Sequence, residues 1–161
     1  MTIMVEPRRV GLPRRASHRR PDIVIYGGHE TTLVDVSLLH PLAPSYRARL
    51  RRGDSARREL RLIQHREQVK RTRYAMLAQQ YDAGRVAPFV VDAFGAFGEC
   101  AEELLRMVAT HAAGNSVCNS ADSFVTEAAA RIAVAVQHGN AKLQEEAFKN
   151  IRAAAGARVR V

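Results

Sequence analysis

Two runs of β-branched residues near the start of the chain predict a β-hairpin. The first run covers residues 22–26 and reads Asp-Ile-Val-Ile-Tyr, and the second covers residues 31–39 and stops at His40-Pro41. Residues of these types favour strands, and the Gly-Gly-His-Glu segment between the runs is typical of a turn. We therefore expect two antiparallel strands joined by a short loop.

The spacing of apolar residues changes to a helical period farther along the chain. A long helix is predicted from Ser55 to Tyr81, and Gly84 follows it as a stop signal. The next elements are a short buried strand and three helices, over residues 87–94, 97–112, 121–137 and 141–155. Gly139 and Asn140 are expected to separate the last two helices.

The order of these elements predicts the fold class α/β, of mixed α+β character. The small mixed β-sheet would contain the hairpin and one further strand, with a crossover helix between them and helices at the C-terminal end. A length of 161 residues fits one domain. We expect the folded domain over residues 20–155, a basic flexible or truncated lead-in over residues 1–19 and a tail over residues 156–161.

Composition excludes several classes of protein. Apolar residues make up 47% of the chain and charged residues 25%, as in globular proteins. No stretch approaches the roughly 20 consecutive apolar residues that span a bilayer, so we expect no membrane partner. The two cysteines form neither a disulfide framework nor a CxxC metal motif, which favours a reduced, intracellular setting.

Charge is distributed unevenly along the chain. The formal net charge is +9, and residues 1–75 contain 17 Lys and Arg against 7 Asp and Glu. Residues 76–161 contain 8 against 9. A basic half of this kind is expected where a protein meets a polyanion such as nucleic acid, although an arginine-rich soluble surface has the same composition.

Asp22 and Asp35 are the first candidates for chemistry. If Tyr26 pairs with Thr31, the two aspartates lie directly opposite each other, whereas a two-residue Gly-Gly loop makes them diagonal neighbours. Both registers place them on the same face. Like charges facing each other destabilise a sheet, and Mg²⁺, which prefers oxygen ligands, would relieve the repulsion. The structural alternative is that Asp22 caps a turn and Asp35 pairs with an arginine.

Lys70 is the third candidate. It shares one helical face with an apolar stripe made of Ile63, Tyr74, Leu77 and Tyr81. A lysine in the stripe that packs on a sheet either extends along apolar surface toward solvent or has a buried partner. Two facing carboxylates in the same domain favour the second interpretation.

Four segments, taken together, resemble a known family. They are residues 20–22 (Arg-Pro-Asp), 35–37 (Asp-Val-Ser), 40–46 (His-Pro-Leu-Ala-Pro-Ser-Tyr) and 70–74 (Lys-Arg-Thr-Arg-Tyr). In this order and spacing they resemble the restriction-like endonuclease domain of non-LTR retrotransposon reverse-transcriptase proteins, which belongs to the PD-(D/E)XK nuclease superfamily. The resemblance implies a restriction-endonuclease-like fold over the whole expected domain.

The resemblance also implies a function and a set of catalytic residues. The function is a metal-dependent DNA endonuclease that nicks a strand and so supports target-primed reverse transcription. Asp22 and Asp35 would hold Mg²⁺ or Mn²⁺. Ser37 stands where the (D/E)XK triplet has its lysine, and Lys70 with Tyr74 matches the K-x-x-K/R-Y pattern that serves instead in this family.

The implied partners are double-stranded DNA and an element-encoded reverse transcriptase with its RNA, and the implied location is the nucleus. Contacts with DNA phosphates are expected from eight arginines: Arg47, Arg49, Arg51, Arg52, Arg57, Arg58, Arg71 and Arg73. Such contacts position a duplex without reading its sequence.

Two further interpretations remain open from the residues. The first is a basic nucleic-acid-binding remnant without catalysis, which would bind DNA in a salt-dependent way and leave it intact. The second is an interaction domain whose helices, from Ala96 onward, dock onto a larger partner.

Overall fold

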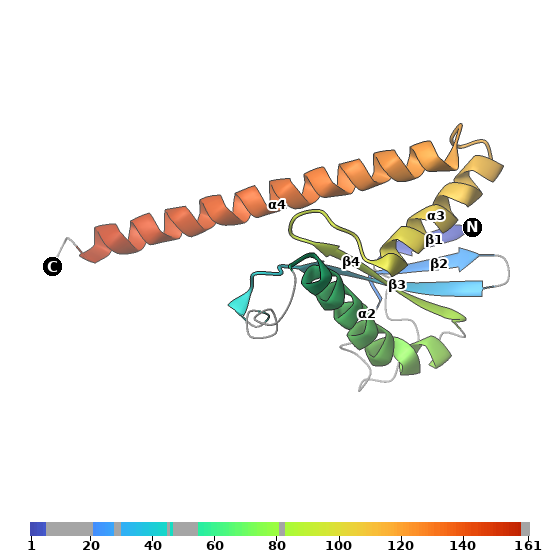
Figure 1. The fold of residues 1–161 in the computed structure, drawn as a ribbon, viewed down its shortest axis with the longest axis horizontal. Helices are drawn as coiled ribbons and strands as arrows, with labels where there is room; N and C mark the ends of the chain where they lie inside the picture. Colours follow the sequence, from blue (N-terminus) through green and yellow to red (C-terminus); the bar gives the residue numbers. More distant parts are fainter. Residues whose placement is uncertain (6–20, 28–29, 45, 47–54, 81–82, 159–161) are drawn as a thin grey trace.

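A four-stranded sheet forms the centre of the protein (Figure 1). The structure is a computed structural model that describes residues 1–5, 21–27, 30–44, 46, 55–80 and 83–158. The strands are β1 (Thr2–Val5), β2 (Ile23–Gly27), β3 (Glu30–Leu39) and β4 (Arg85–Asp92), and they lie side by side in chain order. β1, β2 and β3 are antiparallel neighbours, whereas β4 runs parallel to β3.

Helices cover both sides of this sheet. α2 (Ser55–Gln80) is the crossover that a parallel strand pair requires, α3 (Glu99–Gly114) follows β4, and α4 (Ala121–Arg158) comes last. Figure 1 shows α2 on one side of the sheet and α3 on the other, with α4 extending far beyond both. The predicted class, a mixed α/β chain with a small sheet, is therefore confirmed. None of the described helices combines the length and the hydropathy needed to cross a membrane.

β3 presents a different set of side chains to each helical layer, because side chains alternate along a strand. Leu33 belongs to a buried cluster that contains Tyr74 of α2. Val34 faces the other way and packs with Leu104 of α3. Asp35 follows the alternation and lies on the α2 side, where only 5% of its surface is exposed.

The hairpin has one of the two registers predicted from the sequence. Tyr26 lies opposite Thr31, and the pairing continues to Ile23 opposite Val34. The residue before this ladder, Asp22, donates its backbone N–H to the carbonyl of Val34 at 3.0 Å. This alignment brings Asp22 to the part of β3 that contains Asp35.

The prediction of a flexible or truncated lead-in over residues 1–19 is wrong for Thr2–Val5. Thr2–Val5 forms strand β1 and pairs antiparallel with β2. The segment Thr-Ile-Met-Val contains three β-branched residues, which favour a strand once a free sheet edge is available. Residues 6–20 lie outside the described residues.

The prediction of two separate C-terminal helices is also wrong, because α4 is one helix of 38 residues. A glycine inside a helix costs only about 1 kcal/mol relative to alanine, so Gly139 does not end it. Asn140 adds a favourable contact, since its Nδ2 donates to the carbonyl of Ala93 at 2.9 Å. The helix includes residues 156–158 of the predicted tail, and residues 159–161 lie outside the description.

Candidate active site

Asp35 and Lys70 form a buried ion pair between β3 and α2. The Nζ atom of Lys70 lies 2.5 Å from Oδ2 of Asp35, and the two side chains are 9% and 7% exposed. Lys70 reaches this position because it shares a helical face with Ile63 and Tyr74, both of which are buried against the sheet. The prediction that Lys70 has a buried partner is confirmed.

Tyr74 contacts the same carboxylate from the next turn of α2. Its hydroxyl donates a hydrogen bond to the side chain of Asp35. Burial raises the pKa of the Tyr74 hydroxyl well above its ordinary value of 10.0, and this hydrogen bond and the negative charges of Asp35 and Asp22 raise it further. Tyr74 therefore acts at this position as a neutral donor that orients Asp35.

Asp22 is held beside the pair by the backbone of β3. Its Oδ2 accepts a hydrogen bond from the N–H of Val36 at 2.7 Å, and its own N–H is bonded to Val34. Asp22 thus contacts the residues on both sides of Asp35. A carboxylate that accepts a backbone N–H has a fixed orientation, which leaves its second oxygen available to another ligand.

Three segments distant in sequence therefore supply one polar cluster, which we call the Asp–Lys site: Asp22, Asp35, Lys70 and Tyr74. Two formally negative groups face one formally positive group, so the cluster has an excess of negative charge. Oδ2 of Asp35 is buried and, among the described residues, receives no hydrogen bond of standard geometry, although the Lys70 ammonium lies 2.5 Å from it. A carboxylate oxygen has lone pairs for a cation, and in this structure the Lys70 ammonium is the cation beside it.

The donor set fits Mg²⁺ only as an open site. The described residues contain no group of three or more His, Cys, Asp or Glu that could hold an ion by themselves. Mg²⁺ is usually bound through one or two carboxylates, with waters and substrate phosphates as the other ligands. Asp22 and Asp35 match that pattern, and the Lys70 ammonium beside Asp35 Oδ2 would compete with the ion for that oxygen.

The predicted phosphate-binding arginines are only partly covered by the structure. Arg47, Arg49, Arg51 and Arg52 lie outside the described residues, as do the side chains of Arg57 and Arg58. Arg73 is described, and its guanidinium carbon lies 6.0 Å from the ring centroid of Tyr74, at the limit of a cation–π contact. Arg71 points elsewhere, because its Nη2 donates to Sγ of Cys100 at 2.7 Å.

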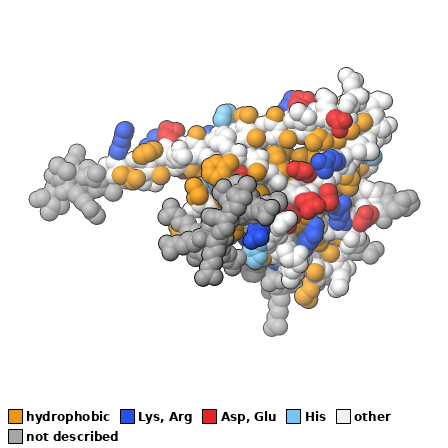
Figure 2. All heavy atoms as spheres, in the orientation of Figure 1, with side chains coloured by type: hydrophobic (Ala, Val, Ile, Leu, Met, Phe, Trp, Pro, Cys, Tyr) orange, Lys and Arg blue, Asp and Glu red, His pale blue; other side chains and the backbone are white. Residues whose placement is uncertain are grey.

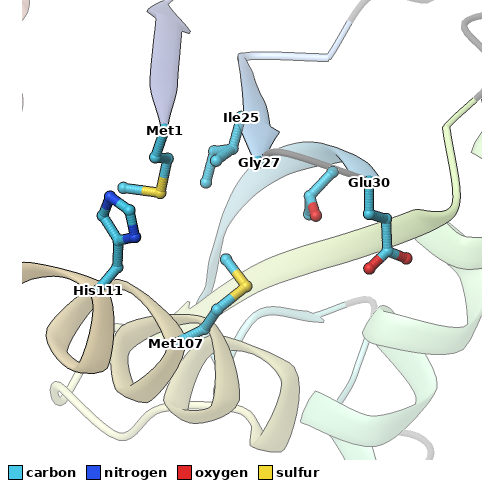
Figure 3. Close-up of a pocket in the computed structure, with 7 residues that line it drawn as sticks. Met1, Ile25, Gly27, Glu30, Met107 and His111 are labelled. Carbon is cyan, nitrogen blue, oxygen red and sulfur yellow. The ribbon is translucent and has the colours of Figure 1, made fainter. Parts of the chain in front are cut away.

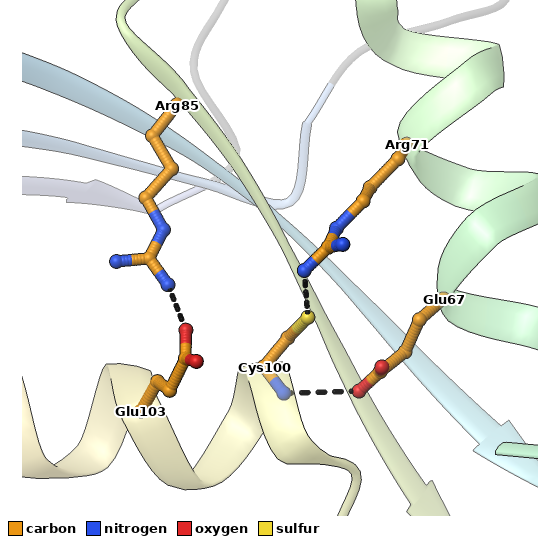
Figure 4. Close-up of polar contacts among 5 residues, drawn as sticks. All are labelled: Glu67, Arg71, Arg85, Cys100 and Glu103. Atoms are coloured by element: carbon orange, nitrogen blue, oxygen red, sulfur yellow. Dashed lines mark hydrogen bonds and ion pairs between the residues drawn. The ribbon is translucent and has the colours of Figure 1, made fainter. Parts of the chain in front are cut away.

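A second buried polar cluster, shown in Figure 4, connects α2 to α3. Glu67 is 5% exposed, and its Oε1 accepts the backbone N–H of Cys100 at 3.1 Å, in the first turn of α3. Gly98 has no side-chain cap of its own, so Glu67 satisfies a helix N–H that would otherwise lack a partner. Burial raises the pKa of the Cys100 thiol, and the Glu67 charge adds to this, while Arg71 opposes it.

Glu67 is a buried residue that sequence reasoning missed. It lies four residues after Ile63 and three before Lys70, so it belongs to the same helical stripe, and its position in that stripe is the signal that could have identified it. Sequence reasoning also missed Asp92, the last residue of β4. It is 1% exposed, and its Oδ1 accepts the N–H groups of Phe94 and Ala96 at 2.8 Å each, which fixes the turn after β4.

A cavity of about 250 Å³ opens on the opposite side of the sheet (Figure 3). Its lining includes Met107 and His111 of α3, together with Met1 and residues of β2 and β3. Ile25 lies in this lining and also packs in the cluster between the sheet and α3. The cavity is therefore separate from the Asp–Lys site, which faces α2.

Comparison with models of known protein families, with curated proteins and with solved structures finds no match for this chain. The function must therefore be inferred from the geometry of the Asp–Lys site and from the sequence around it.

Proposed function

We propose that the protein is a metal-dependent DNA endonuclease of the retrotransposon type, with a restriction-endonuclease-like fold, and that the Asp–Lys site cleaves the phosphodiester bond. The observation that supports this most directly is the convergence of Asp22, Asp35, Lys70 and Tyr74. The sequence resemblance selects the same four residues. Three of them, Asp22, Asp35 and Lys70, also follow from strand register and helix periodicity alone.

The topology supports the same proposal. A hairpin places the two aspartates side by side, and the crossover helix α2 then passes over them and returns the chain parallel to β3. Lys70 therefore approaches Asp35 from α2, although Ser37 occupies the last position of the triplet. A lysine supplied from the helix is what the resemblance implies for this family.

Each residue of the site has a distinct role in the proposed reaction. Asp22 and Asp35 would hold Mg²⁺ or Mn²⁺, and such an ion stabilises developing charge on a phosphate and lowers the pKa of a bound water. Tyr74 keeps the Asp35 carboxylate oriented through its hydrogen bond. Lys70, whose ammonium lies beside Asp35 Oδ2, would orient the attacking water or neutralise charge at the phosphate.

The basic N-terminal half supports DNA as the substrate. The excess of Lys and Arg over residues 1–75 would attract phosphates and position a duplex. Double-stranded DNA, a reverse transcriptase with its RNA and a nuclear location are all part of this proposal. The nick would leave a 3′ end that primes reverse transcription.

A nicking assay on supercoiled plasmid DNA tests the proposal, with the full chain and Mg²⁺ or Mn²⁺. The wild type should convert supercoiled to open-circular DNA, and EDTA should stop it. Asp35→Asn and Lys70→Met should each lower the rate by about 10²-fold or more, while DNA binding in a mobility-shift assay changes little. Circular dichroism and thermal unfolding establish whether each variant is folded.

Matched exposed residues serve as controls. Asp122→Asn and Lys149→Met change the same chemical groups on α4, where Asp122 is exposed and the Lys149 side chain is 69% exposed, and both should nick like the wild type. Full activity in both site variants would refute the assignment. Salt-dependent DNA binding without any cleavage by the wild type would instead identify a non-catalytic nucleic-acid-binding remnant.

A further inference from the structure

The last part of α4 has no contact that holds it to the rest of the described protein. The final anchors are Gln137 and Asn140, whose side-chain amides both donate to the carbonyl of Ala93 at 3.1 and 2.9 Å. Beyond them the helix continues to Arg158. At 1.5 Å per residue this projecting arm is about 27 Å long, and Figure 1 shows it extending away from the sheet.

The arm is amphipathic. From the anchored Gln137, Ala141, Gln144, Phe148 and Ile151 follow at steps of four, three, four and three, the spacing of a coiled-coil seam with one polar position. Phe148 and Ile151 are the large apolar residues of this seam, and they are 65% and 64% exposed. The side of α4 that contacts the body at Gln137 therefore continues into the arm without a described partner.

Between residues 141 and 151 the charged residues of the arm lie outside the seam, and the same spacing continues to Ala155 and Arg158. Three of them, Lys142, Glu146 and Lys149, lie on the far side of the helix, whereas Glu145 and Arg152 border the seam on one edge. Figure 2 shows this separation, with hydrophobic side chains along one edge of the arm and charged side chains along the other. An amphipathic helix obtains most of its stability by packing its apolar face.

We propose that the arm pairs with the arm of a second copy of this chain in an antiparallel, two-fold symmetric helix pair. In this arrangement Phe148 packs against Ile151 of the second copy, and the same contact forms again across the axis. Glu145 of each copy then faces Arg152 of the other copy, so two pairs of opposite charges flank the seam. A parallel arrangement would place Phe148 on Phe148 and would not bring these charges together.

The charges favour a second copy over nucleic acid as the occupant. The projecting arm carries Lys142, Lys149, Arg152 and Arg158 against Glu145 and Glu146, a net charge of +2, so it includes acidic residues that would repel phosphates and that a basic residue of a second copy can pair with. The seam is short, so the interface lies at the small end of the size range of specific contacts. We expect a reversible dimer with a dissociation constant on the order of 1–10 μM.

Sedimentation velocity on the full chain, over protein concentrations from about 0.5 to 100 μM, tests this pairing. The wild type should change from monomer to dimer across this range. The double variant Phe148→Gln/Ile151→Gln should stay monomeric, with an unchanged unfolding temperature because both residues are exposed. Leu143→Gln is the matched control, since Leu143 is 63% exposed but lies outside the seam, and it should dimerise like the wild type.

Charge exchange tests the antiparallel orientation. Glu145→Arg and Arg152→Glu should each weaken the dimer by about 5-fold or more, because like charges then face each other twice. An equimolar mixture of these two variants should recover dimerisation, since each arginine again faces a glutamate. A wild type that remains monomeric at all concentrations, equal loss in the Leu143 control, or no recovery in the mixture would overturn the proposal. These results are independent of nicking activity, because none of these residues belongs to the Asp–Lys site.

Discussion

The ammonium of Lys70 lies 2.5 Å from Oδ2 of Asp35, and more than nine-tenths of each side chain is buried. Desolvation offsets most of the Coulomb attraction in a pair of this kind, and apolar residues of similar volume often stabilise a buried position equally well. Stability alone therefore gives little reason for the pair. A catalytic role, as proposed for the Asp–Lys site, gives a physical reason for keeping both charges there.

Removal of Lys70 should destabilise the fold more than removal of an exposed lysine. In Lys70→Met the Asp35 carboxyl remains buried without its cation, which we expect to lower the free energy of unfolding by about 3–5 kcal/mol. Lys149→Met should lower it by no more than about 0.5 kcal/mol. Urea denaturation monitored by circular dichroism measures both.

The double variant Asp35→Leu/Lys70→Met completes the thermodynamic cycle for this pair. It should recover most of the stability that Lys70→Met loses, because no uncompensated charge stays in the interior. Equal stability of Lys70→Met and the wild type would contradict the buried geometry.

Mg²⁺ should stabilise the folded protein through Asp22 and Asp35. A ligand that binds only the folded state raises the free energy of unfolding by about 2.7 kcal/mol at a concentration 100 times its dissociation constant. The increase in the free energy of unfolding on adding Mg²⁺ should be larger in Lys70→Met than in the wild type, because the Lys70 ammonium no longer competes with the ion beside Asp35. Differential scanning fluorimetry with MgCl₂ or EDTA measures the shift in unfolding temperature.

Asp22→Asn/Asp35→Asn is the variant that separates this effect from general salt screening. It should lose the Mg²⁺-dependent shift while the same ionic strength of NaCl has an equal effect on all variants. An identical Mg²⁺ shift in this variant would place the ion elsewhere.

Tyr74 should make the protein less stable at alkaline pH. Its pKa is raised in the folded state, so above a pH of about 10 the unfolded chain loses the phenol proton while the folded chain keeps it. The free energy of unfolding therefore falls as pH rises beyond 10, with a limiting slope of about 1.4 kcal/mol per pH unit from this residue. Urea titrations of the wild type and Tyr74→Phe at pH 8 to 11 measure the difference.

Tyr74→Phe should lack this component of the alkaline slope, and it should be less stable at neutral pH by about 1–2 kcal/mol, because Asp35 loses a hydrogen bond. Tyr26→Phe is the control, since Tyr26 is 39% exposed and lies outside the Asp–Lys site. Parallel pH profiles for wild type and Tyr74→Phe would show that the Tyr74 hydroxyl is not held by Asp35.

Two glycines should respond to alanine in opposite directions. A Cβ atom at Gly98 would lie within 2.8 Å of Ile63 Cγ2 and closer still to the carboxylate of Glu67, so Gly98→Ala should cost about 1–3 kcal/mol. Gly139 lies inside α4, and apart from its chain neighbours and the backbone of its own helix no atom lies within 4 Å of the new Cβ, so Gly139→Ala should raise the free energy of unfolding by about 0.5–1 kcal/mol. Thermal unfolding compares the two variants, and a neutral Gly98→Ala would show that Glu67 does not lie against that backbone.

The sequence predicted the parts of the site that depend on local periodicity. The turn residues allow two hairpin registers, both of which place Asp22 and Asp35 on one face, and the structure has the one in which Tyr26 pairs with Thr31. The helical stripe that contains Ile63 places Lys70 on the buried face of α2. Both inferences need only alternation along a strand and 3.6 residues per helical turn.

The remaining features depend on contacts between segments far apart in the chain. Thr2–Val5 forms a strand by pairing with the edge of β2, and the hydrogen bond from Asn140 to Ala93 adds stability to a helix that continues through Gly139. Glu67 is buried because Cys100 presents an unpaired N–H at the start of α3. Local sequence patterns do not contain these partners, so they cannot predict the outcome.

Glu67 and Lys70 lie one turn apart on α2, and their side chains bind α3 and β3 respectively. A shift of α2 that moves Lys70 relative to Asp35 must therefore also lengthen the bond between Glu67 and the first turn of α3. A substrate that draws Lys70 away from Asp35 would therefore increase the exchange rate of backbone amide protons near Cys100. A ligand that stabilises the first turn of α3 would increase substrate affinity, and the substrate would increase the affinity of that ligand by the same factor. Deuterium uptake by the backbone amides at the start of α3 should therefore report changes in the contact between Lys70 and Asp35.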